Sequence, residues 1–218
     1  MDDNINGTKP MSRGDKTRNA ILEVSLKHFA ANGYRATSVR DIAGELGIKQ
    51  SALYNHFKSK DEILSTLISE LTSSAITKLF SHFTTPDAYR QGKMLLTSVA
   101  TTFKLISFDA KNEALFKLLM QEIFNYINIR EIYNEYFYQE NVKKLSSYLF
   151  SMMQDEMIRS SDPLLLANEF FSPLFFYQMQ ITLLKIDKKS TSSMVSLFEK
   201  HVEFFWETIK IEKKDTLF

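Results

Sequence analysis

Residues 38–60 read SVRDIAGELGIKQSALYNHFKSK and contain two short helical patterns separated by a glycine. Ser38 and the aspartate three residues later have the spacing of a capping box, in which a hydroxyl and a carboxylate bind the free N–H groups at a helix start. Ile42 and the leucine four residues later give this helix one apolar face. Gly47 is its expected end, because glycine adopts the left-handed conformation of a helix C-terminus without steric strain. The pattern therefore predicts a helix over residues 38–46, followed by a tight turn.

A second short helix is predicted from Lys49 to Phe57. Leu53 and Phe57, at i and i+4, are expected to be its buried residues. Its other side chains are cationic or polar, as in the recognition helix that a helix-turn-helix places in the DNA major groove. These residues are Lys49, Gln50, Ser51, Tyr54 and Asn55.

The flanking sequences complete a head of three helices. Upstream, residues 15–32 form an amphipathic helical pattern that ends at an Asn-Gly pair. Downstream, Ser59 and Glu62 have the spacing of another capping box and predict the start of a long helix. We therefore expect a helix-turn-helix DNA-binding domain over residues 12–60 and a helical effector-binding and dimerisation domain over residues 61–218.

The stretch from residue 16 to residue 67 resembles the TetR family of bacterial transcriptional regulators. The resemblance is spread over many spaced positions, which makes it more specific than a short motif. It implies a dimer formed through the last two long helices and an effector cavity in the larger domain. The matching residues are Ile21, Leu22, Phe29, Gly33, Tyr34, Thr37, Ser38, Val39, Ile42, Ala43, Gly47, Ile48, Leu53, Tyr54, His56, Phe57, Ser59, Lys60, Ile63 and Leu64.

The candidate DNA-binding residues divide by their chemistry. Gln50 and Asn55 suit paired hydrogen bonds to adenine, and Lys49 suits guanine. The resemblance implies phosphate contacts for the Tyr54 hydroxyl and the Lys60 ammonium, although a lone lysine at a helix start is usually a solvated charge. The complete predicted set is Ser38, Arg40, Lys49, Gln50, Ser51, Ala52, Tyr54, Asn55, His56 and Lys60.

Several members of this set have two interpretations. Ser38 caps its helix, and that helix start can also hold a phosphate. Arg40 reaches either the DNA backbone or solvent, and His56 either contacts DNA or caps the helix end. Ser51 and Ala52 depart from the Gly and Thr common in the family, so Ala52 offers a methyl group for a thymine methyl or for packing.

Charge is distributed unevenly along the chain. Residues 1–60 contain 10 Lys and Arg against 6 Asp and Glu, whereas residues 61–218 contain 17 against 20. A basic head on a slightly acidic body is expected if only the head meets phosphate. The absence of cysteine excludes disulfides and thiolate metal sites. No segment reads as a signal peptide or a membrane span, so we expect a cytoplasmic protein without a membrane partner.

Beyond the head, helical periodicity continues without strand alternation, so the predicted fold class is all-α. Pro, Asp and Ser-rich breaks divide the pattern into segments. We expect helices over residues 59–82, 87–107, 111–126, 130–158, 163–185 and 191–211.

The last two predicted helices are apolar on more than one side, so each must be buried on more than one side. A central core helix satisfies this requirement, and so does a helix shared between the core and a subunit interface; the resemblance favours the interface. The predicted interface residues are Phe176, Met179, Leu183, Phe198, Val202 and Phe205. Pro173 either bends the first of these helices or leaves the carbonyl of Glu169 to line a cavity.

Large, soft side chains recur in the middle helices and form either core or an effector cavity. A cavity of this composition would suit a hydrophobic or aromatic effector. The candidate ligand-binding residues are Phe103, Phe116, Met120, Phe124, Tyr148, Met152, Phe171 and Phe175.

Patterns typical of an enzyme are absent from the sequence. It has no glycine-rich phosphate loop, no nucleophile motif and no metal-ligand spacing, so we expect no catalytic residues, cofactor or metal. We therefore predict a ligand-responsive repressor that binds a palindromic operator in double-stranded DNA as a homodimer. One alternative is a DNA-bound regulator controlled by a protein partner instead of a small molecule. The other is a helical carrier or enzyme with an incidental helix-turn-helix.

Overall fold

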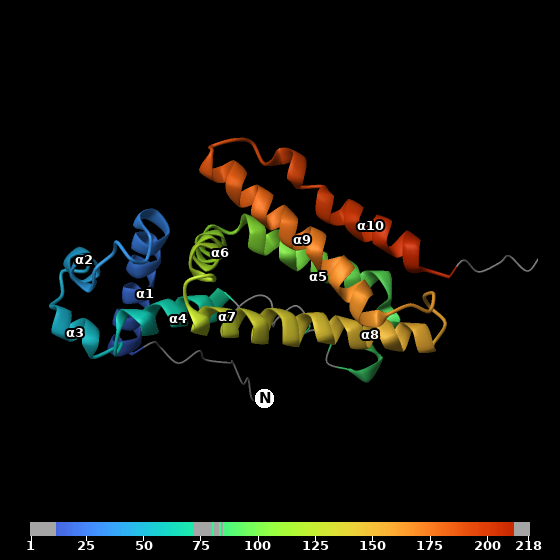
Figure 1. The fold of residues 1–218 in the computed structure, drawn as a ribbon, viewed down its shortest axis with the longest axis horizontal. Helices are drawn as coiled ribbons and strands as arrows, with labels where there is room; N and C mark the ends of the chain where they lie inside the picture. Colours follow the sequence, from blue (N-terminus) through green and yellow to red (C-terminus); the bar gives the residue numbers. More distant parts are fainter. Residues whose placement is uncertain (1–11, 72–79, 81–82, 84, 212–218) are drawn as a thin grey trace, which may run out of the picture. The chain divides into compact units, whose positions relative to one another are not determined.

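The computed structural model describes residues 12–71, 80, 83 and 85–211. Within these residues the secondary structure is helical apart from one isolated backbone bridge between Ile158 and Lys210. The predicted all-α class is therefore confirmed. The chain divides into two compact units between Leu67 and Ile68, and Figure 1 shows the order of the helices in each.

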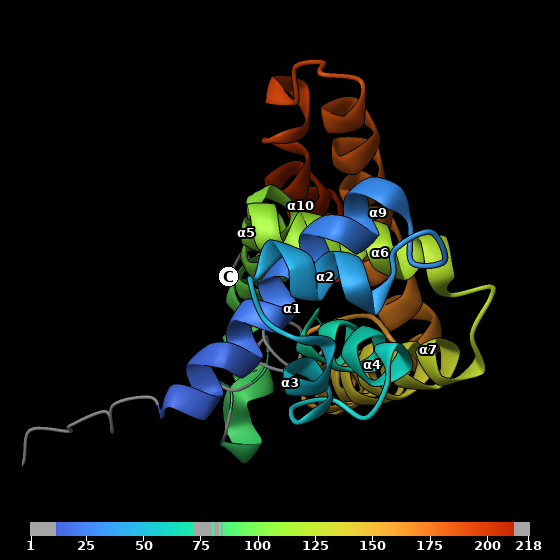
Figure 2. The same cartoon turned by 90° about the vertical axis from the view of Figure 1, so that its left-hand side faces the viewer.

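The first unit is the head. It contains α1 (Arg13–Asn32), α2 (Val39–Glu45), α3 (Gln50–Tyr54) and the start of α4 (Lys60–Leu71). Figure 2 shows α2 packed close to both α1 and α3. The helices share one small apolar core, in which the predicted burial of Leu53 and Phe57 is confirmed. Its buried residues include Ile21, Leu22, Phe29, Ile42, Leu53, Phe57, Ile63 and Leu64.

The second unit is the body, and α9 and α10 run side by side in it in opposite directions (Figure 1). Helix α5 packs against both of them. The elements of the body are the 3-10 helix η3 (Pro86–Gln91), α5 (Lys93–Phe108), α6 (Ala110–Glu122), α7 (Ile127–Ile132), the π-helix η4 (Tyr133–Val142), α8 (Lys143–Gln154), α9 (Pro163–Ile186), the 3-10 helix η5 (Ser192–Met194) and α10 (Leu197–Ile209).

Several predicted helices differ from the observed ones. The helix expected over residues 191–211 begins as the 3-10 helix η5, and α10 starts only at Leu197. The helix expected over residues 111–126 ends at Glu122. The helix expected to start at residue 87 starts at Lys93, because Gly92 has a φ of 54° that an α-helix does not accommodate. The helix expected over residues 130–158 contains the ten-residue π-helix η4. The end of the helix predicted over residues 59–82 lies outside the described residues after Leu71.

One face of α10 belongs to the core of the body. Phe198, Val202 and Phe205 are 1%, 2% and 5% exposed and pack within the main apolar cluster. His201 lies on the same face, and its Nε2–H donates to the carbonyl of Phe170 at 2.9 Å. The assignment of Phe198, Val202 and Phe205 to a subunit interface is therefore wrong, because these side chains are already covered by their own chain.

Candidate nucleic-acid interface

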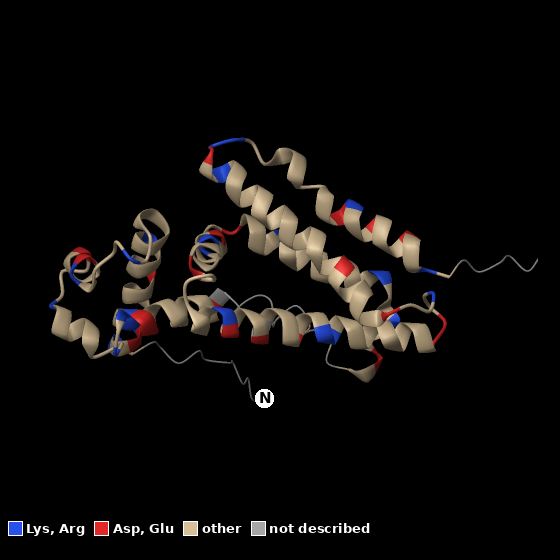
Figure 3. Ribbon diagram, viewed as in Figure 1, with Lys and Arg blue, Asp and Glu red and all other residues tan. Residues whose placement is uncertain are grey.

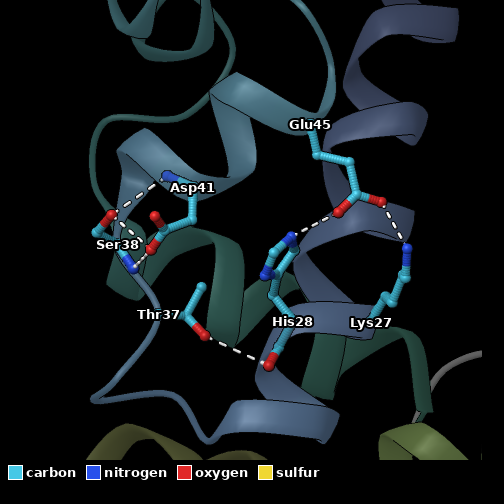
Figure 4. A network of polar contacts seen from close by, with 6 residues as sticks. All are labelled: Lys27, His28, Thr37, Ser38, Asp41 and Glu45. Carbon is cyan, nitrogen blue, oxygen red and sulfur yellow. Dashed lines mark hydrogen bonds and ion pairs between the residues drawn. The ribbon is translucent and has the colours of Figure 1, made fainter.

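The start of α2 is fixed by the predicted capping box. Ser38 Oγ accepts from the backbone N–H of Asp41 at 3.2 Å, and the Asp41 carboxylate accepts from the Ser38 backbone N–H at 2.8 Å (Figure 4). The hydrogen bond from the Ser38 hydroxyl holds the pKa of Asp41 below its ordinary value. These bonds satisfy N–H groups that would otherwise lack partners at the helix start.

The end of α2 forms the predicted glycine turn. Gly47 has a φ of 65°, and the next residue, Ile48, donates its backbone N–H to the carbonyl of Ala43 at 3.0 Å. This bond links the residue after the glycine back to the last turn of the helix, as in a Schellman motif. The turn directs the chain into α3.

Helix α3 is shorter than predicted, because the backbone N–H groups of His56 and Phe57 both bind the carbonyl of Leu53 and tighten the chain into a turn. Asn55 is therefore the C-terminal cap and His56 lies just beyond the helix. His56 and Ala52 are half-buried. Their packing against the head makes both less available to DNA than the more exposed residues around them.

Five predicted DNA-contacting side chains are exposed on and around α3. Tyr54 is 49% exposed, although aromatic residues are commonly buried. None of the five side chains makes a hydrogen bond, ion pair or ring contact with another described residue. These side chains therefore do not stabilise the head, although the backbone that carries them is fixed by other residues. The five are Lys49, Gln50, Ser51, Tyr54 and Asn55.

The Lys60 ammonium makes contacts within the head that were not predicted from the sequence. Its ammonium donates to the carbonyls of Tyr34 and Thr37 at 2.9 and 2.8 Å and lies 4.2 Å from the centre of the Tyr34 ring. Two of its three N–H donors are thus used to tie the α1–α2 turn to the start of α4. Its phosphate contact stays a prediction, and we expect a structural role beside it.

The capping box predicted at the start of α4 is only partly formed. Ser59 Oγ accepts from the Glu62 backbone N–H at 3.1 Å, as expected. The Glu62 carboxylate instead accepts from the backbone N–H of Lys58. Among the other predicted positions, Ser38 and Arg40 are exposed at the start of α2.

A charged network that the sequence did not reveal joins α2 to α1 (Figure 4). Glu45, the last residue of α2, binds Lys27 Nζ and His28 Nε2, each at 2.7 Å. These two hydrogen bonds keep the pKa of Glu45 below its ordinary value. Thr37 adds a bond from Oγ1 to the Gly33 carbonyl at 3.0 Å. The network orients α2, and through the glycine turn it orients α3.

The predicted ligand-binding residues are only partly brought together in the body. Phe171 and Phe175 line a cavity of about 210 Å³ between η4 and α9. Phe103 and Phe116 support this cavity through ring contacts with Phe171 and Phe175 respectively.

The other four lie elsewhere. Met152 is buried in the core, and the Tyr148 hydroxyl donates to the carbonyl of Phe83. Met120 is half-buried in α6. Phe124 is 87% exposed just beyond α6, so its assignment to an enclosed cavity is wrong.

Comparison with known proteins places the head in a family. Residues 21–67 match the model of bacterial regulatory proteins of the tetR family. Residues 21–67 are a TetR-family domain. A curated relative of this domain is the HTH-type transcriptional repressor KstR2 of Mycobacterium tuberculosis, which is 47% identical over 51 residues, covering 23% of this chain and 26% of KstR2. The chain thus matches about a quarter of the length of this repressor.

Solved structures extend the likeness from the TetR-family domain to the fold of the body. A regulator from Saccharomonospora viridis, described in complex with choline, superposes with a TM-score of 0.69 at 20% identity, over 90% of this chain and 99% of that one. A complex of SmeT with triclosan gives a TM-score of 0.72 at 16% identity, over 93% and 94% of the two chains. The chain therefore shares its overall fold with these two proteins over at least 90% of its length.

Two further observations concern the described residues only. No group of three or more His, Cys, Asp or Glu side chains among them is arranged to hold a metal ion. None of the helices they form is both long enough and apolar enough to span a membrane.

Proposed function

We propose that the chain is a dimeric, ligand-responsive transcriptional repressor that binds a palindromic DNA operator. The observation that carries the proposal is the set of exposed side chains on α3, which have no partner within the described residues. Gln50 and Asn55 offer amides to base edges, and Lys49 and Tyr54 offer an ammonium and a hydroxyl. The TetR-family domain and the basic composition of residues 1–60 support the same function.

A dimer is supported by an exposed apolar stripe on the last two helices, which we name the α9/α10 surface. On α9, Leu165, Phe176, Leu183 and Ile186 are between 48% and 57% exposed, and Phe204 on α10 is 71% exposed. These α9 residues are spaced eleven, seven and three positions apart, which keeps them on one face of the helix. Figure 3 shows that α9 carries almost no charge, and its only charged residues are Glu169 and Lys185.

A hollow beside Phe204 gives this surface a complementary shape. It measures about 320 Å³ and is lined by Glu169 and Pro173 of α9 and by Phe204 and Thr208 of α10. A projecting ring next to a hollow on one surface suits a two-fold dimer, because each copy then presents both parts to the other. Two heads related by this two-fold axis would read the two halves of a palindrome.

Selection from a random duplex library, followed by titration at several salt concentrations, tests the DNA-binding function. We expect one enriched palindromic sequence. If each of two heads neutralises about three phosphates, affinity should fall about a thousandfold between ~50 and ~200 mM salt. A library without enrichment, or an affinity that salt does not change, would refute the proposal.

A further inference from the structure

The cavity between η4 and α9 has the size of a single substituted ring. Its volume is about 210 Å³. An apolar cavity of about 150 Å³ accommodates benzene, so this one leaves room for a small substituent. This volume is below the ~300–1,000 Å³ typical of pockets that hold drug-sized ligands.

Aromatic rings form the walls of this cavity, and they support one another. Tyr133 and Phe137 of η4 stack with their ring centres 5.2 Å apart and an angle of 13° between the planes. Phe171 and Phe175 of α9 each present an edge to Phe137 at 6.0 Å. An aromatic ligand can add further edge-to-face or offset-stacked contacts to these rings, which an aliphatic chain cannot.

The polar groups at the cavity include both hydrogen-bond acceptors and donors. Ser172 Oγ donates to the Asn168 carbonyl at 2.7 Å, so the hydroxyl oxygen is left to accept. Asn168 Nδ2 donates to the Leu164 carbonyl at 2.8 Å, which leaves the amide oxygen to accept.

The most buried donor is the Tyr133 hydroxyl, which has no hydrogen-bond partner in the described part of the chain; the Tyr138 hydroxyl also lines the cavity but is on an exposed residue. Burial raises the pKa of Tyr133, so this hydroxyl keeps its proton. A ligand hydroxyl both donates and accepts, and it matches this arrangement. None of the residues that line the cavity is charged, so an ionic ligand would find no counter-charge.

The backbone beside the cavity is also unusual. Tyr133–Val142 is a π-helix of ten residues. π-helical geometry mostly occurs as single turns inside α-helices, frequently at functional sites. Here it places Tyr133 and Phe137 in a parallel stack against α9, and a ligand in contact with both rings would stabilise this backbone over a regular α-helix.

We propose that this cavity binds a small, neutral, single-ring aromatic compound bearing a hydroxyl group, of the phenol class. Binding itself requires no DNA, whereas its role as the effector signal rests on the proposed function. Contacts on η4 and α9 would then carry the signal, since α9 also provides the α9/α10 surface.

Calorimetry or ligand-observed NMR on the full chain, without DNA, tests the cavity directly with p-cresol as the probe. We expect saturable binding of one p-cresol per chain, at least about tenfold tighter than toluene, benzoate or cyclohexanol, because each of these lacks the hydroxyl, the neutral charge or the ring. The absence of saturable p-cresol binding would overturn the proposal. Equal binding of benzoate or cyclohexanol would overturn the neutral or the aromatic assignment.

Two variants separate the site from general effects on folding. Tyr133→Phe should remove most of the tenfold preference for p-cresol over toluene while leaving toluene binding unchanged. The matched control is Tyr89→Phe, which removes a hydroxyl that binds Asp155 and does not line the cavity. An unchanged preference in Tyr133→Phe, or an equal loss in Tyr89→Phe, contradicts the assignment.

A DNA titration distinguishes failure of this inference from failure of the proposed function. If p-cresol binds but no duplex is bound specifically, the cavity assignment stands and the repressor function fails. If a duplex is bound specifically but p-cresol is not, the reverse holds. Release of a bound operator by p-cresol in the wild type, and its reduction in Tyr133→Phe, would support both.

Discussion

Replacing Phe204 with aspartate should convert the dimer into a folded monomer. The Phe204 side chain is 71% exposed in the single chain. Of the ~200 Å² that a phenylalanine can bury, about 140 Å² is therefore available, which at ~25 cal/mol per Å² corresponds to about 3.5 kcal/mol. A two-fold dimer contains this contact twice, so the loss reaches about 7 kcal/mol, or about five decades in the dimer dissociation constant.

Sedimentation velocity over a concentration series from nanomolar to micromolar measures this change. The wild type should sediment as a dimer throughout the micromolar range, and Phe204→Asp as a monomer. Thermal unfolding should show a cooperative transition for the variant, because the substituted side chain lies at the surface. Operator affinity should fall with the dimer, because two linked heads bind far more tightly than one.

Two other substitutions serve as controls. Leu105→Asp changes an equally exposed leucine, 67% exposed on α5, outside the α9/α10 surface, and should leave the dimer intact. Phe198→Asp places a charge in the core and should unfold the body. A Phe204→Asp protein that remains dimeric, or a wild type that is monomeric at micromolar concentration, would refute the reasoning.

Gly47→Ala should destabilise the head by about 1–2 kcal/mol, because Gly47 has a φ of 65°. Gly44 lies within α2 and has open space around it, so Gly44→Ala should stabilise the head by about 0.5–1 kcal/mol. Urea unfolding of the two variants should show opposite signs. Tyr54→Phe should weaken binding to all duplexes alike, and a changed base preference would contradict this role. Gln50→Ala should lose about 1–3 kcal/mol of discrimination at one base pair, and an unchanged preference in titrations with single-base operator variants would contradict that role. Burial lowers the pKa of His201 below its ordinary 6.5, so the folded body binds fewer protons than the unfolded chain near that pH. The free energy of unfolding of the body should therefore decrease as the pH falls below 6.5. His201→Gln should flatten this slope in urea titrations between about pH 8 and pH 5, and an unchanged slope would exclude His201 as its source.

The features predicted correctly from the sequence depend on neighbouring residues. The Ser38 capping box, the turn at Gly47 and the burial of Leu53 each follow from local patterns among residues within five positions of one another. The partners of Glu45 could not be predicted in this way, because Lys27 and His28 lie 18 and 17 residues away on another helix.

The face of α10 that meets the core could not be predicted from the sequence, for a different reason. Phe198, Phe204 and Phe205 have similar hydrophobicity, so periodicity alone does not separate the face that meets the core from the face that meets solvent. The π-helix has no sequence signal in a pattern that already fits an α-helix. Both features are decided by tertiary packing, and only the three-dimensional structure reveals them.

In the head, the residues that stabilise the fold are separate from the residues exposed on α3, and this affects how such a protein can evolve. The side chains that hold α2 and α3 in place, such as Ser38, Glu45 and Lys60, are separate from those exposed on α3. Substitutions at Gln50 or Asn55 therefore leave the folding free energy nearly untouched, since surface changes away from structural contacts usually have small effects. A duplicated copy could acquire a new target by a few such substitutions while remaining folded at every intermediate step. The same separation makes this head a suitable starting point for retargeting to chosen DNA sequences.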